Sequence, residues 1–187
     1  EPESRNRGVL VVLNDTIHSA KWAHKSNTFS LQTFVSVNAG VQGLVVEGRA
    51  KYLSCAVSRK IYPLPAKAFP KVAVVQSYLD NDGQIIALVG KSEFDGVVID
   101  GFGAGHVSFG MMDEIKKLKI PVVVSSRTGS GMCATKTYGY KGSEIDLQSS
   151  GCVMSGWLSA IKARLLLMIL IADEIPPQEI KNEFENF

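Results

Sequence analysis

The sequence has little cysteine and no cluster of metal ligands. Its three cysteines, Cys55, Cys133 and Cys152, include no Cys-x-x-Cys pair. An odd number of widely spaced thiols argues against a disulfide framework and is typical of buried or incidental cysteines. His18 and His24 lie six positions apart, which is neither one face of a helix nor a zinc-ligand spacing. We therefore expect no metal site.

Long apolar runs and an excess of one charge are also absent. The longest apolar run, residues 165–172, is too short to span a bilayer. The 20 basic and 18 acidic residues leave a formal charge of +2, with no long run of either sign. This balance of charges does not indicate binding to nucleic acid or to an anionic membrane surface. A hydrophobic content of 45% over 187 residues suits one domain, or one domain with an appendage.

The first residues, EPESRNR, contain neither an initiator methionine nor the apolar core of a signal peptide. We therefore expect the chain to be a piece of a longer protein. Its compartment, cytoplasmic or periplasmic, stays open.

The first regular element is an apolar run at residues 9–13 that ends in polar residues. Such a run predicts a buried parallel strand, because both faces of a parallel sheet are covered. Ligands bind beyond the carboxyl ends of such strands, so residues 14–27 are a candidate site. Residues 28–70 are broken by glycine and proline, and they predict an irregular connector with one or two short antiparallel strands.

Beyond the connector, strands and helices alternate. Short β-branched runs predict strands at 71–76, 95–100 and 121–126, with a final short strand at 151–154. Helices are predicted after residue 83, at about 109–118, at 160–172 and after 176, and the apolar helix at 160–172 should be buried. The fold class is therefore α/β, with a small parallel sheet and flanking helices.

In such a sheet the ends of three strands converge, at residues 77–78, 101–106 and 125–127. The glycine loop at 101–106 departs from a dinucleotide fingerprint, because His106 stands where the third glycine belongs. Two other readings stay open. The loop is either a turn whose amides approach a small anion, or a tight turn without a ligand.

Two charged residues near these loops allow a functional and a structural interpretation. Lys25 is either a solvated surface charge or a lysine that lowers the proton affinity of a nucleophile. Glu144, with Asp146 in the first turn of a helix capped by Ser143, is explained by helix electrostatics alone.

Several motifs follow one another along the chain. They are residues 8–15 (GVLVVLND), 18–20 (HSA), 25–28 (KSNT), 69–75 (FPKVAVV), 101–106 (GFGAGH), 123–131 (VVSSRTGSG), 142–144 (GSE) and 162–167 (KARLLL). Their order resembles that of the bacterial-type L-asparaginase/glutaminase family over essentially all 187 residues.

The resemblance implies a hydrolase that deamidates L-asparagine, and in some members L-glutamine, through a threonine nucleophile and a covalent acyl-enzyme. It implies no metal and no organic cofactor. Family members are tetramers built from pairs of dimers, and each active site uses groups from two subunits. The resemblance therefore implies a small-molecule substrate and self-association, or association with the missing N-terminal part.

Three residues carry roles by resemblance. Lys25 matches the lysine that activates the threonine, Glu144 matches the acidic residue that holds the α-amino group of the substrate, and His106 occupies a position near the substrate. The family's N-terminal threonine and its Thr-Asp-Thr motif are absent from this sequence.

We therefore expect residues 1–27 to end an N-terminal domain, residues 28–70 to form a linker and residues 71–187 to form the C-terminal domain. We also expect the chain alone to be inactive.

Two other functions stay open. The chain is either a non-enzymatic domain for small-molecule binding or oligomerisation, with an exposed apolar patch, or an amidase subunit that passes ammonia to a partner.

Overall fold

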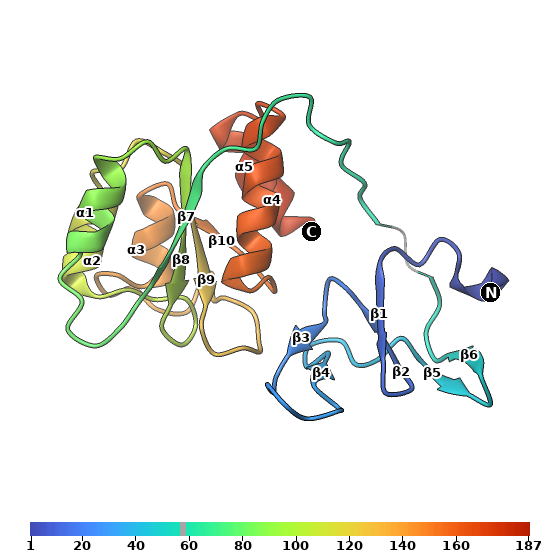
Figure 1. Ribbon diagram of the computed structural model, residues 1–187. Coiled ribbons are helices and arrows are strands. Elements are labelled where there is room, and N and C mark those ends of the chain that lie inside the picture. The colour runs from blue at the N-terminus through green and yellow to red at the C-terminus, as the bar shows by residue number, and fades with distance from the viewer. Residues whose placement is uncertain (57–58) are drawn as a thin grey trace. The chain divides into compact units, whose positions relative to one another are not determined.

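The computed structural model describes residues 1–56 and 59–187, and the chain divides into two units, Glu1–Ile61 and Tyr62–Phe187 (Figure 1). The first unit is built on an antiparallel sheet of four strands in the order β1-β2-β5-β6, with a separate antiparallel pair, β3 and β4. Its elements are a short 3-10 helix at Pro2–Ser4 and the strands β1 (Leu10–Leu13), β2 (Thr16–Ser19), β3 (His24–Lys25), β4 (Phe34–Val35), β5 (Gly43–Val46) and β6 (Arg49–Tyr52).

The prediction of a buried parallel strand at residues 9–13 is wrong. β1 pairs antiparallel with β2, and the side chains of Val12 and Leu13 are exposed. Asn14 and Asp15 form the turn between the two strands, with φ angles of 48° and 57°. Two successive residues with positive φ give a turn whose twist matches that of a hairpin, and Asn and Asp adopt this conformation more readily than most residues do. The antiparallel strands expected in the connector are confirmed by the β5–β6 pair.

The second unit contains a four-stranded sheet in the order β10-β9-β8-β7, in which every pair of neighbours is parallel. The predicted fold class, α/β with a small parallel sheet and flanking helices, is confirmed. Its elements are β7 (Val72–Gln76), α1 (Gln84–Gly90), β8 (Gly96–Gly101), α2 (Phe109–Ile115), β9 (Val122–Ser126), α3 (Glu144–Ser149), β10 (Val153–Met154), α4 (Ala160–Ala172) and α5 (Pro177–Glu185).

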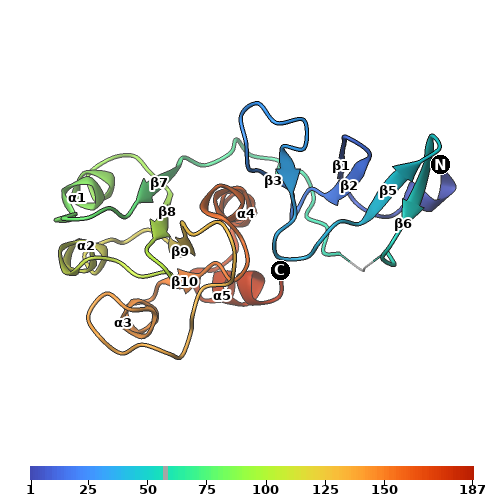
Figure 2. The ribbon, with the colours of Figure 1, turned by 90° about the horizontal axis from the view of Figure 1, so that it is seen from below.

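Helices cover both faces of this sheet, with α1, α2 and α3 on one face and α4 and α5 on the other (Figure 2). The β-branched runs explain the two layers, because successive side chains of a strand point to opposite faces. In β8, Val97 and Ile99 pack in the core under α1 and α2, whereas Val98 packs in the core under α4.

The expectation that the helix at 160–172 is buried needs a correction. Leu166, Leu167 and Leu170 of α4 are buried against the sheet, but Ile161 is 63% exposed and Leu165 is 51% exposed. A helix that packs on one face of a sheet buries one stripe only, whatever residues it carries elsewhere. Among the described residues, no helix combines the length and the apolar character needed to cross a membrane.

Candidate functional site

The loop that follows β8 folds back on itself and presents His106 beside the carboxyl end of the sheet. The amide of Phe102 donates to the carbonyl of His106, and the amides of Gly105 and His106 donate to the carbonyl of Phe102. A Cβ at Gly101 would lie 2.9 Å from the carbonyl oxygen of His106, so only glycine fits this close approach. Because these three amides are bonded within the loop, they are not free to bind an anion. The geometry therefore favours the tight-turn interpretation.

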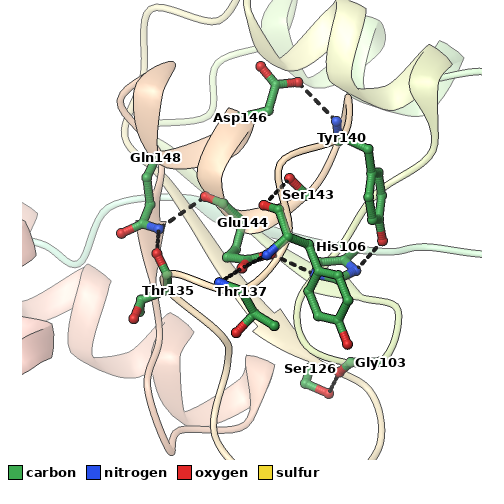
Figure 3. A network of polar contacts seen from close by, with 12 residues as sticks. Gly103, His106, Ser126, Thr135, Thr137, Tyr140, Ser143, Glu144, Asp146 and Gln148 are labelled. Atoms are coloured by element: carbon green, nitrogen blue, oxygen red, sulfur yellow. Dashed lines mark hydrogen bonds and ion pairs between the residues drawn. The ribbon is translucent and has the colours of Figure 1, made fainter.

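Glu144 is the first residue of α3, directly after the N-cap residue Ser143. Its side chain is fully buried. The Oε1 atom accepts hydrogen bonds from the backbone amides of Thr137 and Tyr138, at 2.6 Å each, and the Oε2 atom lies 2.9 Å from Nε2 of His106 (Figure 3). The structure thus brings two of the three predicted site residues, His106 and Glu144, into direct contact.

The buried carboxyl of Glu144 is held in its ionised form. Burial by itself would raise the pKa of Glu144, but the amides of Tyr138 and Thr137, its own amide and His106 all favour the charged form. The net result is a pKa below the ordinary value for glutamate. A carboxylate that accepts several N–H bonds at a helix N-terminus is a stable arrangement, because the helix dipole favours negative charge there.

His106 connects Glu144 to a tyrosine that the sequence did not single out. The hydroxyl of Tyr140 lies 2.6 Å from Nδ1 of His106, so both ring nitrogens have partners. The ring of Tyr138 packs edge-on against His106, with 4.9 Å between ring centroids, and the ring of Tyr140 does so at 5.4 Å. The result is a chain from a buried carboxylate through an imidazole to a tyrosine hydroxyl (Figure 3).

The segment before α3 is fixed by further polar contacts. Ser143 donates from its hydroxyl to the carbonyl of Tyr138 at 2.7 Å, and Gln148 donates to the carbonyl of Thr135 at 2.8 Å. Gly142 has a φ of 83°, and a Cβ there would lie 2.5 Å from a backbone oxygen of Val107. The sequence Gly-Ser-Glu therefore combines a position that requires glycine, a serine at the N-cap position that holds the preceding segment, and the buried carboxylate.

The lysines near this site are paired with other carboxylates. Lys116 lies 3.0 Å from Asp146, and Lys141 lies 2.7 Å from Asp113. Burial would raise the pKa of Asp146, but the amide of Gly142 and Lys116 outweigh that effect and lower it. In the part of the chain that the structure describes, no lysine or arginine forms an ion pair with Glu144.

Lys25, the third predicted site residue, belongs to the first unit. It lies in β3, opposite Phe34 of β4, and it is exposed. Among the described residues, the side chain of Lys25 takes part in no hydrogen bond and no ion pair. The neighbouring hydroxyls of Ser26 and Thr33 donate to the backbone carbonyls of Thr33 and Asn27, respectively. The Lys25 ammonium is therefore available to a group outside this network.

Sequence reasoning missed Tyr140 and the two amides that hold Glu144. Tyr140 and His106 are separated by 34 positions, so no local pattern connects them. One available signal was the pair of tyrosines, Tyr138 and Tyr140, directly before the Gly-Ser-Glu motif. In the described ranges, no group of three or more His, Cys, Asp and Glu side chains is arranged to hold a metal ion.

Two family profiles match the chain. The profile described as "Glutaminase/Asparaginase C-terminal domain" matches residues 71–184, and the profile described as "Asparaginase, N-terminal" matches residues 1–57.

Several curated proteins are similar over nearly the whole chain. An L-asparaginase of Bacillus licheniformis is 28% identical, over 98% of this chain and 56% of its own length. L-asparaginase 2 of Escherichia coli is 33% identical, over 98% of this chain and 53% of its own length. A glutaminase-asparaginase of Acinetobacter glutaminasificans is 25% identical, over 99% of this chain and 57% of its own length. The chain thus spans about half the length of these relatives.

Proposed function

The chain belongs to the glutaminase/asparaginase family, and from this premise we propose that it is part of an L-asparaginase-type amidohydrolase. The reaction converts L-asparagine and water to L-aspartate and ammonia, with L-glutamine as a second substrate class. The names of the relatives, L-asparaginase and glutaminase-asparaginase, support this assignment. The structural observation that carries it is the ionised Glu144 with His106 at the carboxyl end of a parallel sheet, where α/β proteins bind small ligands.

The proposal places the threonine nucleophile outside these 187 residues, in an N-terminal part of the protein. Lys25 then acts on that threonine, because a nearby ammonium lowers the proton affinity of a hydroxyl. Its exposure and its lack of a described partner are compatible with that role. The nearby hydroxyls of Ser26 and Thr33 donate to backbone carbonyls, so neither serves as the activated nucleophile.

Glu144 supplies the negative charge for the α-ammonium group of the substrate, and His106 belongs to the same subsite. Ion pairing between a carboxylate and an ammonium is the chemistry that such a subsite needs. In the structure, Oε1 of Glu144 is held by two amides and Oε2 by His106. The side chain of Glu144 is also 0% exposed, so direct contact between its carboxylate and the ammonium would require the groups that cover it to move.

Ammonia release with L-asparagine tests the assignment in two steps. The purified 187-residue chain should release none, and a longer protein that contains these residues should be active. In that longer protein, Lys25→Ala should lower kcat by roughly 10²- to 10⁴-fold. Lys51→Ala, which changes an exposed lysine of β6, is the matched control and should leave kcat unchanged. Ammonia release by the 187-residue chain that is abolished by Lys25→Ala would contradict the missing nucleophile.

The exposed stripe of α4 supports a second part of the proposal, self-association of the protein. Ile161 and Leu165 lie one turn apart on this helix and are more than half exposed. Exposed apolar side chains on one helix face are typical of interaction surfaces. Light scattering should give a mass above that of the monomer, and Leu165→Lys should lower it. A monomeric mass at every concentration would contradict self-association.

A further inference from the structure

The outer edge of β7 carries backbone groups with which no strand of the described chain pairs. β7 ends the strand order β10-β9-β8-β7, so its second edge is open. The opposite end of the sheet is formed by β10, which is only two residues long. An edge strand presents N–H and C=O groups that can pair with another chain, and a very short edge strand presents few of them. β7, with five residues, is therefore the edge that is able to accept a further strand.

The direction of these backbone groups follows from the hydrogen bonds on either side of β7. The amide of Ser77 donates to a carbonyl of β8, so the backbone of Ser77 faces into the sheet. Because successive residues of a strand direct their backbone groups to opposite sides, Val72, Val74 and Gln76 face outward. The carbonyl of Val72 accepts a hydrogen bond from Nε of Arg164 at 2.8 Å, which closes that end of the edge. The positions open to a partner are therefore Val74 and Gln76.

Helix α1 lies beside this edge and carries apolar residues on more than one side. Its sequence, QIIALVG, contains no charged residue. Ile86 and Val89 are buried in the core, whereas Ile85 is 42% exposed and Leu88 is 62% exposed. A surface helix ordinarily carries charged or polar residues on the side away from the core. The exposed side of α1 is therefore suited to contact with another molecule.

The exposed side of α1 points away from α2. A Cβ at Gly83 would lie 2.5 Å from a backbone oxygen of α2, and a Cβ at Gly90 would lie 2.7 Å from Leu118, which follows α2. These two glycines therefore face α2. Since successive helical residues are rotated by about 100°, Ile85 and Leu88 lie on the opposite side of α1. In Figure 2, α1 and β7 lie at the same edge of the second unit, so this apolar side borders the open strand.

The charges beside the open strand differ between its two ends. α1 leads back from the carboxyl end of β7 to the amino end of the parallel strand β8, so α1 begins where β7 ends. Asp80 and Asp82 lie there, are exposed and form no ion pair with a described residue. Lys91 follows α1 at the amino end of β7 and is also exposed and unpaired within the described ranges. Its neighbours Lys71 and Glu93 neutralise each other at 3.2 Å.

We infer that the open edge of β7 and the exposed side of α1 bind an extended segment of a partner protein. The segment pairs its backbone with Val74 and Gln76, and its apolar side chains contact Ile85 and Leu88. It runs antiparallel to β7, which is the more stable pairing per residue. Charge complementarity then selects a segment with a basic residue at its amino end, facing the two aspartates, and an acidic residue at its carboxyl end, facing Lys91. This inference does not depend on the proposed function.

Two blocked peptides of the same composition, acetyl-KVTVTVE-amide and acetyl-EVTVTVK-amide, test the inference on the 187-residue chain. Titration followed by two-dimensional NMR should show that the first binds roughly fivefold more tightly, because the second reverses both charges. Hydrogen exchange at the amides of Val74 and Gln76 should slow when the first peptide binds, since these N–H groups gain acceptors. Exchange at Ala73 and Val75, whose amides face β8, should not change.

Substitutions locate the surface. Leu88→Ser removes an apolar contact and should weaken binding of the first peptide roughly tenfold. Leu165→Ser is the matched control, because Leu165 is 51% exposed on α4, at the other face of the sheet, and it should leave binding unchanged. Asp80→Asn combined with Lys91→Gln removes one charge from each end, and it should reduce the difference between the two peptides.

Several results would overturn the inference. They are equal affinity of the two peptides, unchanged exchange at Val74 and Gln76 when a peptide is bound, and no binding of either peptide at millimolar concentration. An equal loss of binding by Leu88→Ser and Leu165→Ser would place the peptide elsewhere. Slower exchange at the two amides that appears without peptide, as the protein concentration rises, would show that a second copy of the chain occupies the edge instead.

Discussion

The two units of the chain bury different kinds of side chain. In Tyr62–Phe187, apolar residues from β7, β8, β9 and β10 are covered on both faces of the sheet, in two continuous clusters. In the described part of Glu1–Ile61, Ile17 is the buried apolar side chain, whereas four polar residues are buried. These four are Thr16, His18, Thr33 and Ser36.

The units do not differ in unsatisfied buried polar groups, since each has one among the described residues. Nδ1 of His18 lies 2.9 Å from the hydroxyl of Ser36, but its Nε2 atom has no hydrogen-bond partner there. In the second unit Glu144 has partners on both carboxylate oxygens, whereas Nδ2 of the buried Asn81 has none. Because apolar burial is the main stabilising contribution to folding, the second unit should fold by its own core, and the first unit should not.

Separating the two units should give the largest effect on folding of all the changes predicted here. A fragment of residues 62–187 is expected to unfold in one cooperative transition, since it contains both apolar clusters. A fragment of residues 1–61 is expected to show no sigmoidal transition, because a small antiparallel sheet with little apolar burial is marginal in water. Circular dichroism during heating measures both. A cooperative transition in the 1–61 fragment would remove the contrast between the units.

A pair of substitutions on one helix tests whether core burial carries the stability of the second unit. Leu167→Ala, at a position that is 0% exposed, should lower the free energy of unfolding by about 2–5 kcal/mol. Leu165→Ala removes the same atoms at a position that is 51% exposed, and it should cost less than about 1 kcal/mol. Urea denaturation of both variants measures the two costs. Equal costs would mean that α4 is not packed as described.

As the pH falls, the first unit should lose stability at a higher pH than the second unit does. Burial lowers the pKa of His18 below 6.5, so as the pH falls below that value the unfolded form takes up a proton first, and the first unit loses stability. The lowered pKa of Glu144 stabilises the fold above the ordinary carboxyl pKa of 4.5, and that contribution is lost only as the pH falls through the lower folded value.

Amide exchange at Ile17 in β2 and at Ile99 in β8 reports the two units separately. Protection at Ile17 should decline first on acidification. His18→Asn, which keeps a polar group near Ser36 and does not titrate in this range, should remove that decline. Simultaneous loss of protection at both positions would show that one transition includes both units.

The smallest expected effect is at the turn between β1 and β2. Asp15 has a φ of 57°, and Asp15→Gly would place Asn-Gly, the favoured sequence for such a turn, at this position. We expect a gain of about 0.5–1 kcal/mol in the stability of the hairpin, measured by amide exchange in β2. Asp15→Ala should have the opposite effect, because alanine tolerates positive φ poorly.

The sequence predicted the second unit well and the first unit poorly. The runs that became β7, β8 and β9 are rich in β-branched residues and bounded by turns, and that local pattern is enough to identify buried strands. Residues 9–13 are equally apolar, yet Leu10–Leu13 form one strand of a hairpin in which Val12 and Leu13 are exposed. An apolar run shows that a strand is able to be buried. Whether the strand is buried depends on which other elements pack against it.

The candidate site shows the same limit. The glycine loop and the start of a helix at Glu144 are local features, and both were visible in the sequence. The hydroxyl of Ser143 was expected to cap this helix, but it donates to the carbonyl of Tyr138 instead. The contact between His106 and Glu144 spans 38 positions, and the contact between Tyr140 and His106 spans 34. Such contacts depend on the turn geometry of two loops, and neither loop has a periodic pattern that would predict it.

The strand order of the second unit has a consequence for synthesis. Each strand from β7 to β10 pairs with the next one along the chain. The strands can therefore join the sheet in the order in which they leave the ribosome. The helices α1, α2 and α3 emerge between these strands and can cover one face as it forms. The other face, with Val72, Val98 and Val123, stays open until α4 and α5 have left the ribosome. A nascent chain that stops before residue 160 would therefore display a complete apolar sheet face, which is the kind of surface that chaperones bind.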